Sequence, residues 1–111
     1  MRHALRIDTE GHSTLLDLDA PEGSLKVLQT AVDGLIEPVR VANGFEMYVN
    51  EEGLFRADFG LNGWALAAFG VTIKGAVVLT GTVDDEGETL GLTDEDVRIL
   101  SAGQIDPASN D

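Results

Sequence analysis

Polar and apolar residues alternate in two runs near the start of the chain, at residues 5–7 and 13–18. A polar segment, Glu10-Gly11-His12, separates the two runs. Alternation with a period of two is typical of strands that bury one face, and a short polar connection between such runs favours a hairpin. We therefore expect the chain to open with an antiparallel pair of strands.

Helical spacing replaces this alternation after residues 21–24. Four apolar residues follow at i, i+3, i+7 and i+10, which places them on one side of a helix: Leu25, Leu28, Val32 and Leu35. Ser24 is a good N-cap, and Gly34 suits the left-handed position beyond the last turn. The pattern predicts an amphipathic helix that buries all four apolar residues.

The middle of the chain is rich in β-forming residues. The runs at residues 35–41 and 45–49 are joined by Ala42-Asn43-Gly44. Asn-Gly between two such runs favours a hairpin, because both residues tolerate a positive φ. A turn is expected at residues 50–53, followed by a short extended piece at residues 54–56.

Helix caps and one apolar run organise the remainder of the chain. Asn62 is expected to cap a short helix over residues 63–69, which a glycine then ends. The apolar run at residues 76–79 predicts a buried strand. Thr93 is expected to cap a last helix, because the acidic residues 94–96 suit the positive end of a helix dipole.

These elements together predict the fold class α+β. We expect one small domain over residues 1–102, with a mainly antiparallel sheet and two or three helices packed largely on one face. Residues 103–111 are expected to form a disordered tail. A length of 111 residues suits a single domain with one modest core.

The chain is strongly acidic, with 20 acidic residues, 7 basic residues and a net charge of −13. This balance argues against direct binding of nucleic acid or anionic lipid, because both ligands need a basic surface. The apolar stretch at residues 61–81 contains Lys74 and several glycines, so we do not expect it to span a membrane. No secretory signal follows the basic N-terminus, and a cytoplasmic location is expected.

Candidate catalytic and metal-binding groups are few. The chain has no cysteine, and its two histidines, His3 and His12, lack the spacing of a catalytic triad or a zinc site. The glycines follow no phosphate-binding pattern, and residues 84–88 lack the ligand spacing of a calcium loop. We expect neither an enzyme nor a protein that depends on a cofactor or metal.

Two surfaces remain as candidates for binding a host protein. All aromatic residues, four Phe, one Tyr and one Trp, lie within residues 45–69, around the predicted turn at residues 50–53. Aromatic residues concentrate in cores and at interfaces, and an exposed Trp64 beside Gly63 would favour an interface. The first hypothesis is an interaction surface formed by Tyr48, Asn50, Glu51, Glu52 and Trp64.

The alternative hypothesis is an acidic decoy. Seven acidic residues and no basic residue occur within residues 84–96, namely Asp84, Asp85, Glu86, Glu88, Asp94, Glu95 and Asp96. Carboxylates spaced like phosphates would occupy the nucleic-acid site of a host DNA-binding or defence protein. The same charges would also act through solubility alone.

Association of two copies into a two-fold dimer is also expected. The clustered aromatic segment is expected to expose more apolar surface than a monomer keeps. A strand at residues 45–49, placed at the edge of the sheet, would then pair across the two-fold axis.

Several short motifs occur in a fixed order: Val32-Asp33-Gly34-Leu35-Ile36-Glu37, Asn50-Glu51-Glu52-Gly53, Asn62 to Ala65, Gly75-Ala76-Val77-Val78 and Gly91 to Asp96. In these motifs, which lie within residues 24–98, the chain resembles an uncharacterised domain-of-unknown-function family of small proteins from bacteriophages, plasmids and actinobacterial chromosomes. The family usually has glycine where Asp33 stands, and often arginine where Gly63 and Trp64 stand. The resemblance implies an accessory protein of a mobile element, and it implies no particular activity.

Overall fold

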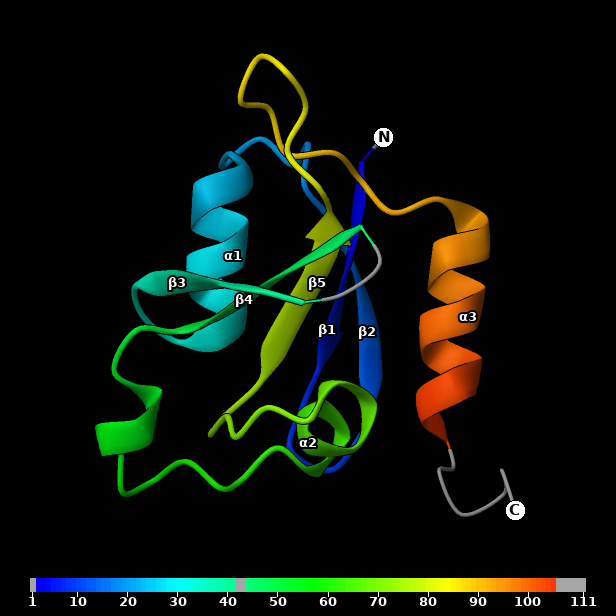
Figure 1. Ribbon diagram of the computed structural model, residues 1–111. Coiled ribbons are helices and arrows are strands. Elements are labelled where there is room, and N and C mark those ends of the chain that lie inside the picture. Colours follow the sequence, from blue (N-terminus) through cyan, green and yellow to red (C-terminus); the bar gives the residue numbers. More distant parts are fainter. Residues whose placement is uncertain (1, 42–43, 106–111) are drawn as a thin grey trace.

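The computed structural model describes residues 2–41 and 44–105, with side chains described as far as residue 101. Its centre is a five-stranded antiparallel sheet in the order β2-β1-β5-β4-β3 (Figure 1). The strands are β1 (His3–Ile7), β2 (Ser13–Asp17), β3 (Ile36–Arg40), β4 (Phe45–Asn50) and β5 (Val77–Gly81). The helices are α1 (Ser24–Val32), the 3-10 turn η1 (Gly53–Phe55), α2 (Gly63–Phe69) and α3 (Asp94–Ile105).

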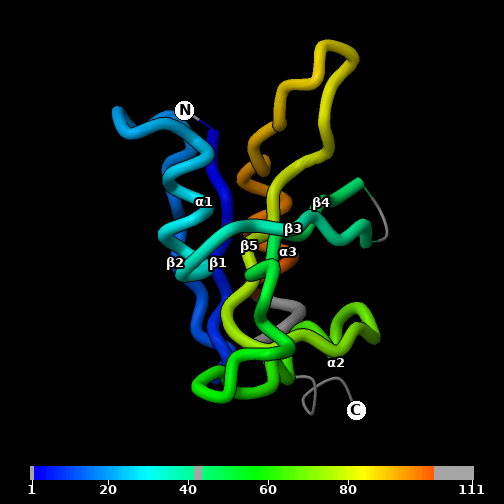
Figure 2. The backbone as a smooth tube through the Cα atoms, turned by 90° about the vertical axis from the view of Figure 1, so that its left-hand side faces the viewer, coloured from blue at the N-terminus to red at the C-terminus, as the bar shows by residue number. Residues whose placement is uncertain are grey.

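The sheet separates two apolar clusters, because successive residues of a strand point to opposite faces. On one face, the helix α1 packs on Ala4, Tyr48 and Val78. On the other face, side chains of α2 and α3 pack on residues that include Met47 and Leu79. Figures 1 and 2 show α1 and α3 on opposite sides of the sheet. The α+β class is confirmed, with two helices on one face and one on the other.

Both predicted hairpins are present, as the pairs β1–β2 and β3–β4. Residues 42–43 of the second hairpin's turn lie outside the described residues. The strand predicted at residues 45–49 is β4, and it lies between β5 and β3. Its placement at the edge of the sheet was therefore wrong, and the two edges belong to β2 and β3.

The helix predicted between Ser24 and Gly34 is present as α1, but its buried face begins later than the spacing suggested. Leu28 and Val32 are buried together with Val27 and Ala31. Leu25 and Leu35 are exposed, so their predicted burial was wrong. Leu25 lies one turn before the buried face, and Leu35 lies beyond the end of the helix, where the chain turns toward β3.

The ends of α1 also differ from the prediction. Gly23 occupies the N-cap position without a side-chain hydrogen bond, so Ser24 is not the cap. At the other end, Asp33 adopts the left-handed conformation with φ 62°, one position before the predicted Gly34. The left-handed conformation is unfavourable for most residues other than glycine, and aspartate is among the few that tolerate it.

The later elements follow their predicted caps. Asp96 and Thr93 form a reciprocal capping box at the start of α3, in which each backbone N–H donates to the other side chain at 3.0 Å. The helix continues to Ile105, past the predicted domain boundary at residue 102.

Residues 54–56 were predicted to be extended, but residues 53–55 form the 3-10 turn η1. The N–H groups of Phe55 and Arg56 donate back to the carbonyls of Glu52 and Gly53. Within residues 2–41 and 44–105, no helix has the length and apolar character needed to cross a membrane.

The buried side chain of Asn62 connects three parts of the chain. Its Oδ1 accepts a hydrogen bond from the N–H of Ala65 at 2.9 Å, which caps α2 as predicted. Its Nδ2 donates to the carbonyl of Ile7 at 3.1 Å and to the carbonyl of Gly75 at 3.0 Å. The end of β1, the segment before β5 and the start of α2 are therefore fixed by one amide.

Replacement of Asn62 by alanine should lower the free energy of unfolding by about 2–4 kcal/mol, because it leaves buried backbone groups without partners. Asn62→Asp keeps the cap acceptor but loses the amide donor, and it should destabilise the domain to a similar extent. Urea denaturation followed by circular dichroism measures both effects. Wild-type stability in Asn62→Asp would mean that the helix cap alone matters.

Candidate functional site

The residues of the predicted interaction surface do not form one surface. Tyr48 is buried beneath α1, on one face of the sheet. Trp64 is buried on the opposite face, and only 6% of it is exposed. Its ring meets Phe69 edge to face, with 5.5 Å between ring centroids, and its Nε1 has no hydrogen-bond partner among the described residues. The expectation that Trp64 is exposed was wrong, because α3 packs against α2 and covers this face.

Asn50 is a structural residue of the turn. Its Nδ2 donates to the carbonyls of Val32 and Asp33 at 3.0 Å each, and its Oδ1 accepts from the N–H of Glu52 at 2.8 Å. These bonds tie the end of α1 to the turn after β4. A Cβ on Gly34 would lie 2.6 Å from this Nδ2, so only glycine fits beside Asn50. The side chain of Asn50 can make these hydrogen bonds because position 34 carries no side chain.

The exposed part of this region is η1 together with the two residues before it. Glu51 and Glu52 are exposed, as expected for a contact surface. Leu54 is 60% exposed and Phe55 is 90% exposed, which makes Phe55 the most exposed large apolar side chain among the described residues. Sequence reasoning missed this pair by assigning it to a strand. Charged and turn residues on both sides, at residues 51–53, 56 and 58, were the available signal, because such residues favour an exposed loop.

The turn holds Leu54 and Phe55 in a defined position. The Nζ of Lys74 donates to the carbonyl of Arg56 at 2.9 Å, which fastens the end of η1 to the segment before β5. A Cβ on Gly53 would meet the carbonyl of Lys74 at 2.9 Å, so the two segments lie in close contact. The guanidinium of Arg56 also lies 4.2 Å from the centre of the Phe59 ring. Phe55 is thus presented to solvent from a fixed backbone.

A groove of about 250 Å³ lies beside η1. Val39, Val49 and Ile73 contribute its apolar part. Exposed carboxylates of Glu37 and Glu51 contribute its polar rim, together with Lys74, whose Nζ donates to the carbonyl of Arg56. An apolar side chain flanked by positive charge has the chemistry that this groove accepts.

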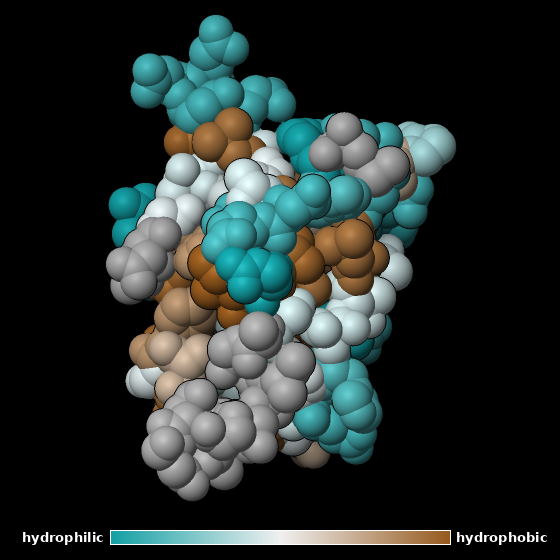
Figure 3. All heavy atoms as spheres, turned by 90° about the vertical axis from the view of Figure 1, so that its right-hand side faces the viewer, coloured by the Kyte–Doolittle hydropathy of each residue, from teal (hydrophilic) through white to brown (hydrophobic). Residues whose placement is uncertain are grey.

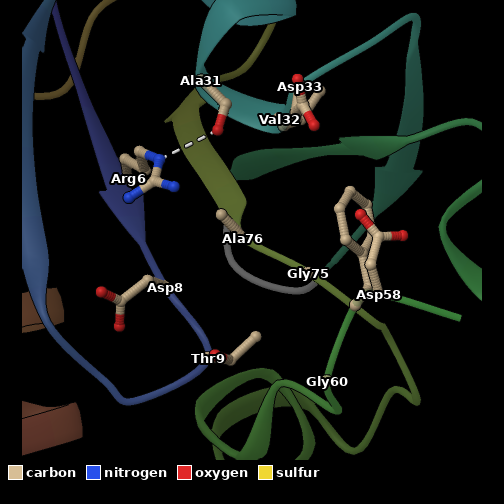
Figure 4. Close-up of a pocket in the computed structure, with 11 residues that line it drawn as sticks. Arg6, Asp8, Thr9, Ala31, Val32, Asp33, Asp58, Gly60, Gly75 and Ala76 are labelled. Carbon is tan, nitrogen blue, oxygen red and sulfur yellow. Dashed lines mark hydrogen bonds between the residues drawn. The ribbon is translucent and has the colours of Figure 1, made fainter. Parts of the chain in front are cut away.

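A second cavity, of about 200 Å³, lies between the end of α1, β1 and the loop before α2 (Figure 4). The Nε of Arg6 donates to the carbonyl of Ala31 at 2.9 Å and so caps the end of α1. Asp8, Asp33 and Asp58 also line this cavity. With one arginine and three carboxylates, the cavity combines opposing charges and defines no single ligand class.

Two of these carboxylates are held in the ionised form. Burial raises the pKa of Asp8, whereas hydrogen bonds from the N–H groups of His12 and Glu10 lower it. The lowering effects together are larger, so the pKa of Asp8 lies below its ordinary value. The side chain of Arg56 donates to Asp58 and lowers the pKa of that carboxyl. Both groups serve local structure, in the β1–β2 turn and in the loop after η1.

The acidic residues of the decoy hypothesis occupy two places. The loop at residues 84–88 projects from the body, where Figure 3 shows it as a hydrophilic tip at the top of the view, and residues 94–96 begin α3. Asp84 accepts hydrogen bonds from the N–H groups of Glu86 and Glu88, and Glu95 pairs with Arg98. With Asp96 in its capping box, several of these carboxylates are engaged within the chain. In the described part of the chain, no group of three His, Asp or Glu side chains is placed to hold a metal ion.

The fold and the groove define a small α+β domain with an exposed apolar turn. The sequence model of one family, described as a domain of unknown function (DUF3846), matches residues 1–104. The chain belongs to this family. No curated protein and no solved structure matches the chain significantly.

Phe55 and Trp64, which lie on either side of the loop between η1 and α2, should respond differently to truncation. Trp64→Ala should cost about 3–5 kcal/mol of unfolding free energy, because it empties a packed site in the core. Phe55→Ala should change that free energy by no more than about 0.5 kcal/mol, because its ring is surrounded by water. Chemical denaturation of the two variants measures the difference. Equal destabilisation would contradict the assignment of Phe55 to the surface.

Proposed function

We propose that this protein is a non-enzymatic protein-binding domain whose contact surface is η1 with its groove. The observation that carries the proposal is the exposure of Phe55 on a fastened turn. Burial of an exposed phenylalanine side chain against a partner contributes about 1.5–3 kcal/mol, and such anchors dominate many interfaces. Since the turn is already ordered, binding loses little conformational entropy there.

The partner is a protein segment that presents an apolar side chain next to lysine or arginine. The apolar side chain enters the groove beside Ile73, and the basic residues face the carboxylates of Glu37, Glu51 and Glu52. Opposite charge speeds association and selects against acidic partners in a chain of net charge −13. The motif resemblance supports a phage or plasmid setting, in which this partner would be a host protein in the cytoplasm.

The absence of catalysis is part of the proposal. His12, the exposed histidine, lies in the turn between β1 and β2. Its Nδ1 is 3.5 Å from Oδ2 of Asp8 and 3.7 Å from Oε1 of Glu10. Neither of the two cavities, whose walls belong to the described residues, contains a histidine.

Selection from a displayed library of random peptides tests the proposal. Selected peptides should share an apolar residue flanked by Lys or Arg, and their affinity is then measured by fluorescence anisotropy. Phe55→Ala should weaken binding by at least about tenfold, which corresponds to 1.4 kcal/mol. The matched control is Leu66→Ala, which truncates another exposed apolar residue on α2 and should bind normally.

The competing decoy hypothesis predicts a different result. Binding would then fall steeply with salt and with neutral replacement of Asp85 and Glu86, and Phe55→Ala would bind as wild type. That result would overturn the proposal. Chemical shifts that change at residues 84–96 on peptide binding, with none at η1, would overturn it as well.

A further inference from the structure

The two edges of the sheet differ in what they offer to another strand. Two hydrogen bonds flank the β1–β2 pair. The N–H of Leu18 donates to the carbonyl of Arg2 at 2.8 Å, and the N–H of Asp8 donates to the carbonyl of His12 at 3.0 Å. Even-numbered residues of β2 therefore bond to β1, given the register of the pair. The backbone N–H and C=O groups of Ser13 and Leu15 and the N–H of Asp17 therefore point outward, whereas the carbonyl of Asp17 accepts a turn hydrogen bond from the N–H of Ala20 at 3.4 Å.

The edge at β3 is blocked. The N–H of Glu51 donates to the carbonyl of Leu35 at 2.8 Å, so odd-numbered residues of β3 face β4. Ile36, Pro38 and Arg40 face outward. Pro38 has no N–H, and its place at the centre of this row prevents a continuous ladder with another strand.

The edge at β2 has no such protection. Its sequence, Ser-Thr-Leu-Leu-Asp, contains no proline and no lysine, and its backbone pairs with β1 without a bulge. Leu15, at its centre, is 50% exposed. Figure 2 shows β2 at one margin of the sheet. An open edge of this kind is a template for strand addition.

We propose that β2 pairs with β2 of a second copy of this chain, antiparallel and centred on Leu15, to form one continuous sheet across a two-fold axis. Leu15 then faces the partner's Leu15, and Ser13 faces the partner's Asp17. The facing pairs exchange about four main-chain hydrogen bonds, because each hydrogen-bonded antiparallel pair exchanges two and the carbonyl of Asp17 in each copy is already engaged with Ala20.

The strand is self-complementary, which favours a second copy over an unrelated chain. In this register the acidic Asp17 faces a serine, and no acidic residue of β2 faces another. Thr14 faces the partner's Leu16 on the opposite face, and the exposed Leu15 gains an apolar neighbour. The interface is small and each copy carries a net charge of −13, so the dimer should be weak and should strengthen with salt.

A cysteine at the two-fold axis tests this pairing directly, because the chain has no cysteine of its own. Facing residues of a hydrogen-bonded pair have Cα atoms about 5.5 Å apart, which a disulfide spans. Leu15→Cys should form a covalent dimer under mild oxidation. Leu35→Cys, at a leucine that is 61% exposed and lies before the opposite edge strand, should remain monomeric. Equal cross-linking of both variants, or of neither, would overturn the proposal.

Sedimentation of the untethered protein provides the second measurement. Wild type should shift from monomer to dimer across the micromolar range, at a lower concentration in high salt. Leu15→Lys should remain monomeric, because two lysines then face each other, whereas Leu35→Lys adds the same charge at the other edge and should dimerise. Phe55→Ala should dimerise normally, which separates this test from that of the peptide-binding groove. A wild type that stays monomeric throughout would overturn the proposal.

Discussion

The fold depends on the buried amide of Asn62. Two backbone segments end near this side chain with carbonyls that face the interior. A helix begins there with an N–H that has no partner within the helix itself. Burial of such groups without partners would cost more than the small net stability of a domain this size allows. A primary amide supplies two donors and one acceptor in a single plane, and this geometry matches the arrangement of the three segments.

Several other residues that stand out in the sequence are of this architectural kind. Asn50 and Asn62 each join segments that are distant in the sequence, and Gly34 leaves room for one of them. Residues of this type determine where the chain turns, and they do not determine what it binds. The side chains with freedom to specify a partner, such as Glu52 and Phe55, lie between the architectural positions and point into solvent.

Local signals allowed much of the fold to be predicted from sequence. The alternation in the first hairpin, the cap at Asn62 and the capping box at Thr93 each depend on neighbouring residues, and each is present. The site was less predictable, because exposure depends on contacts between distant segments. Trp64 is covered by a helix that follows it by about thirty residues, and nothing in its own segment indicates which face that helix takes. Phe55 is exposed because no later segment in the described part of the chain covers it.

The position of β5 between β1 and β4 has a consequence for folding order. Leu5 pairs with Leu79 across most of the length of the chain, so the sheet cannot close until β5 is in place. High contact order of this kind slows folding, because chain entropy is lost before the long-range pairs form. During synthesis the first hairpin therefore emerges with both of its edges open. Its edges remain open to pairing with other chains in that interval, while the C-terminal half is still being made.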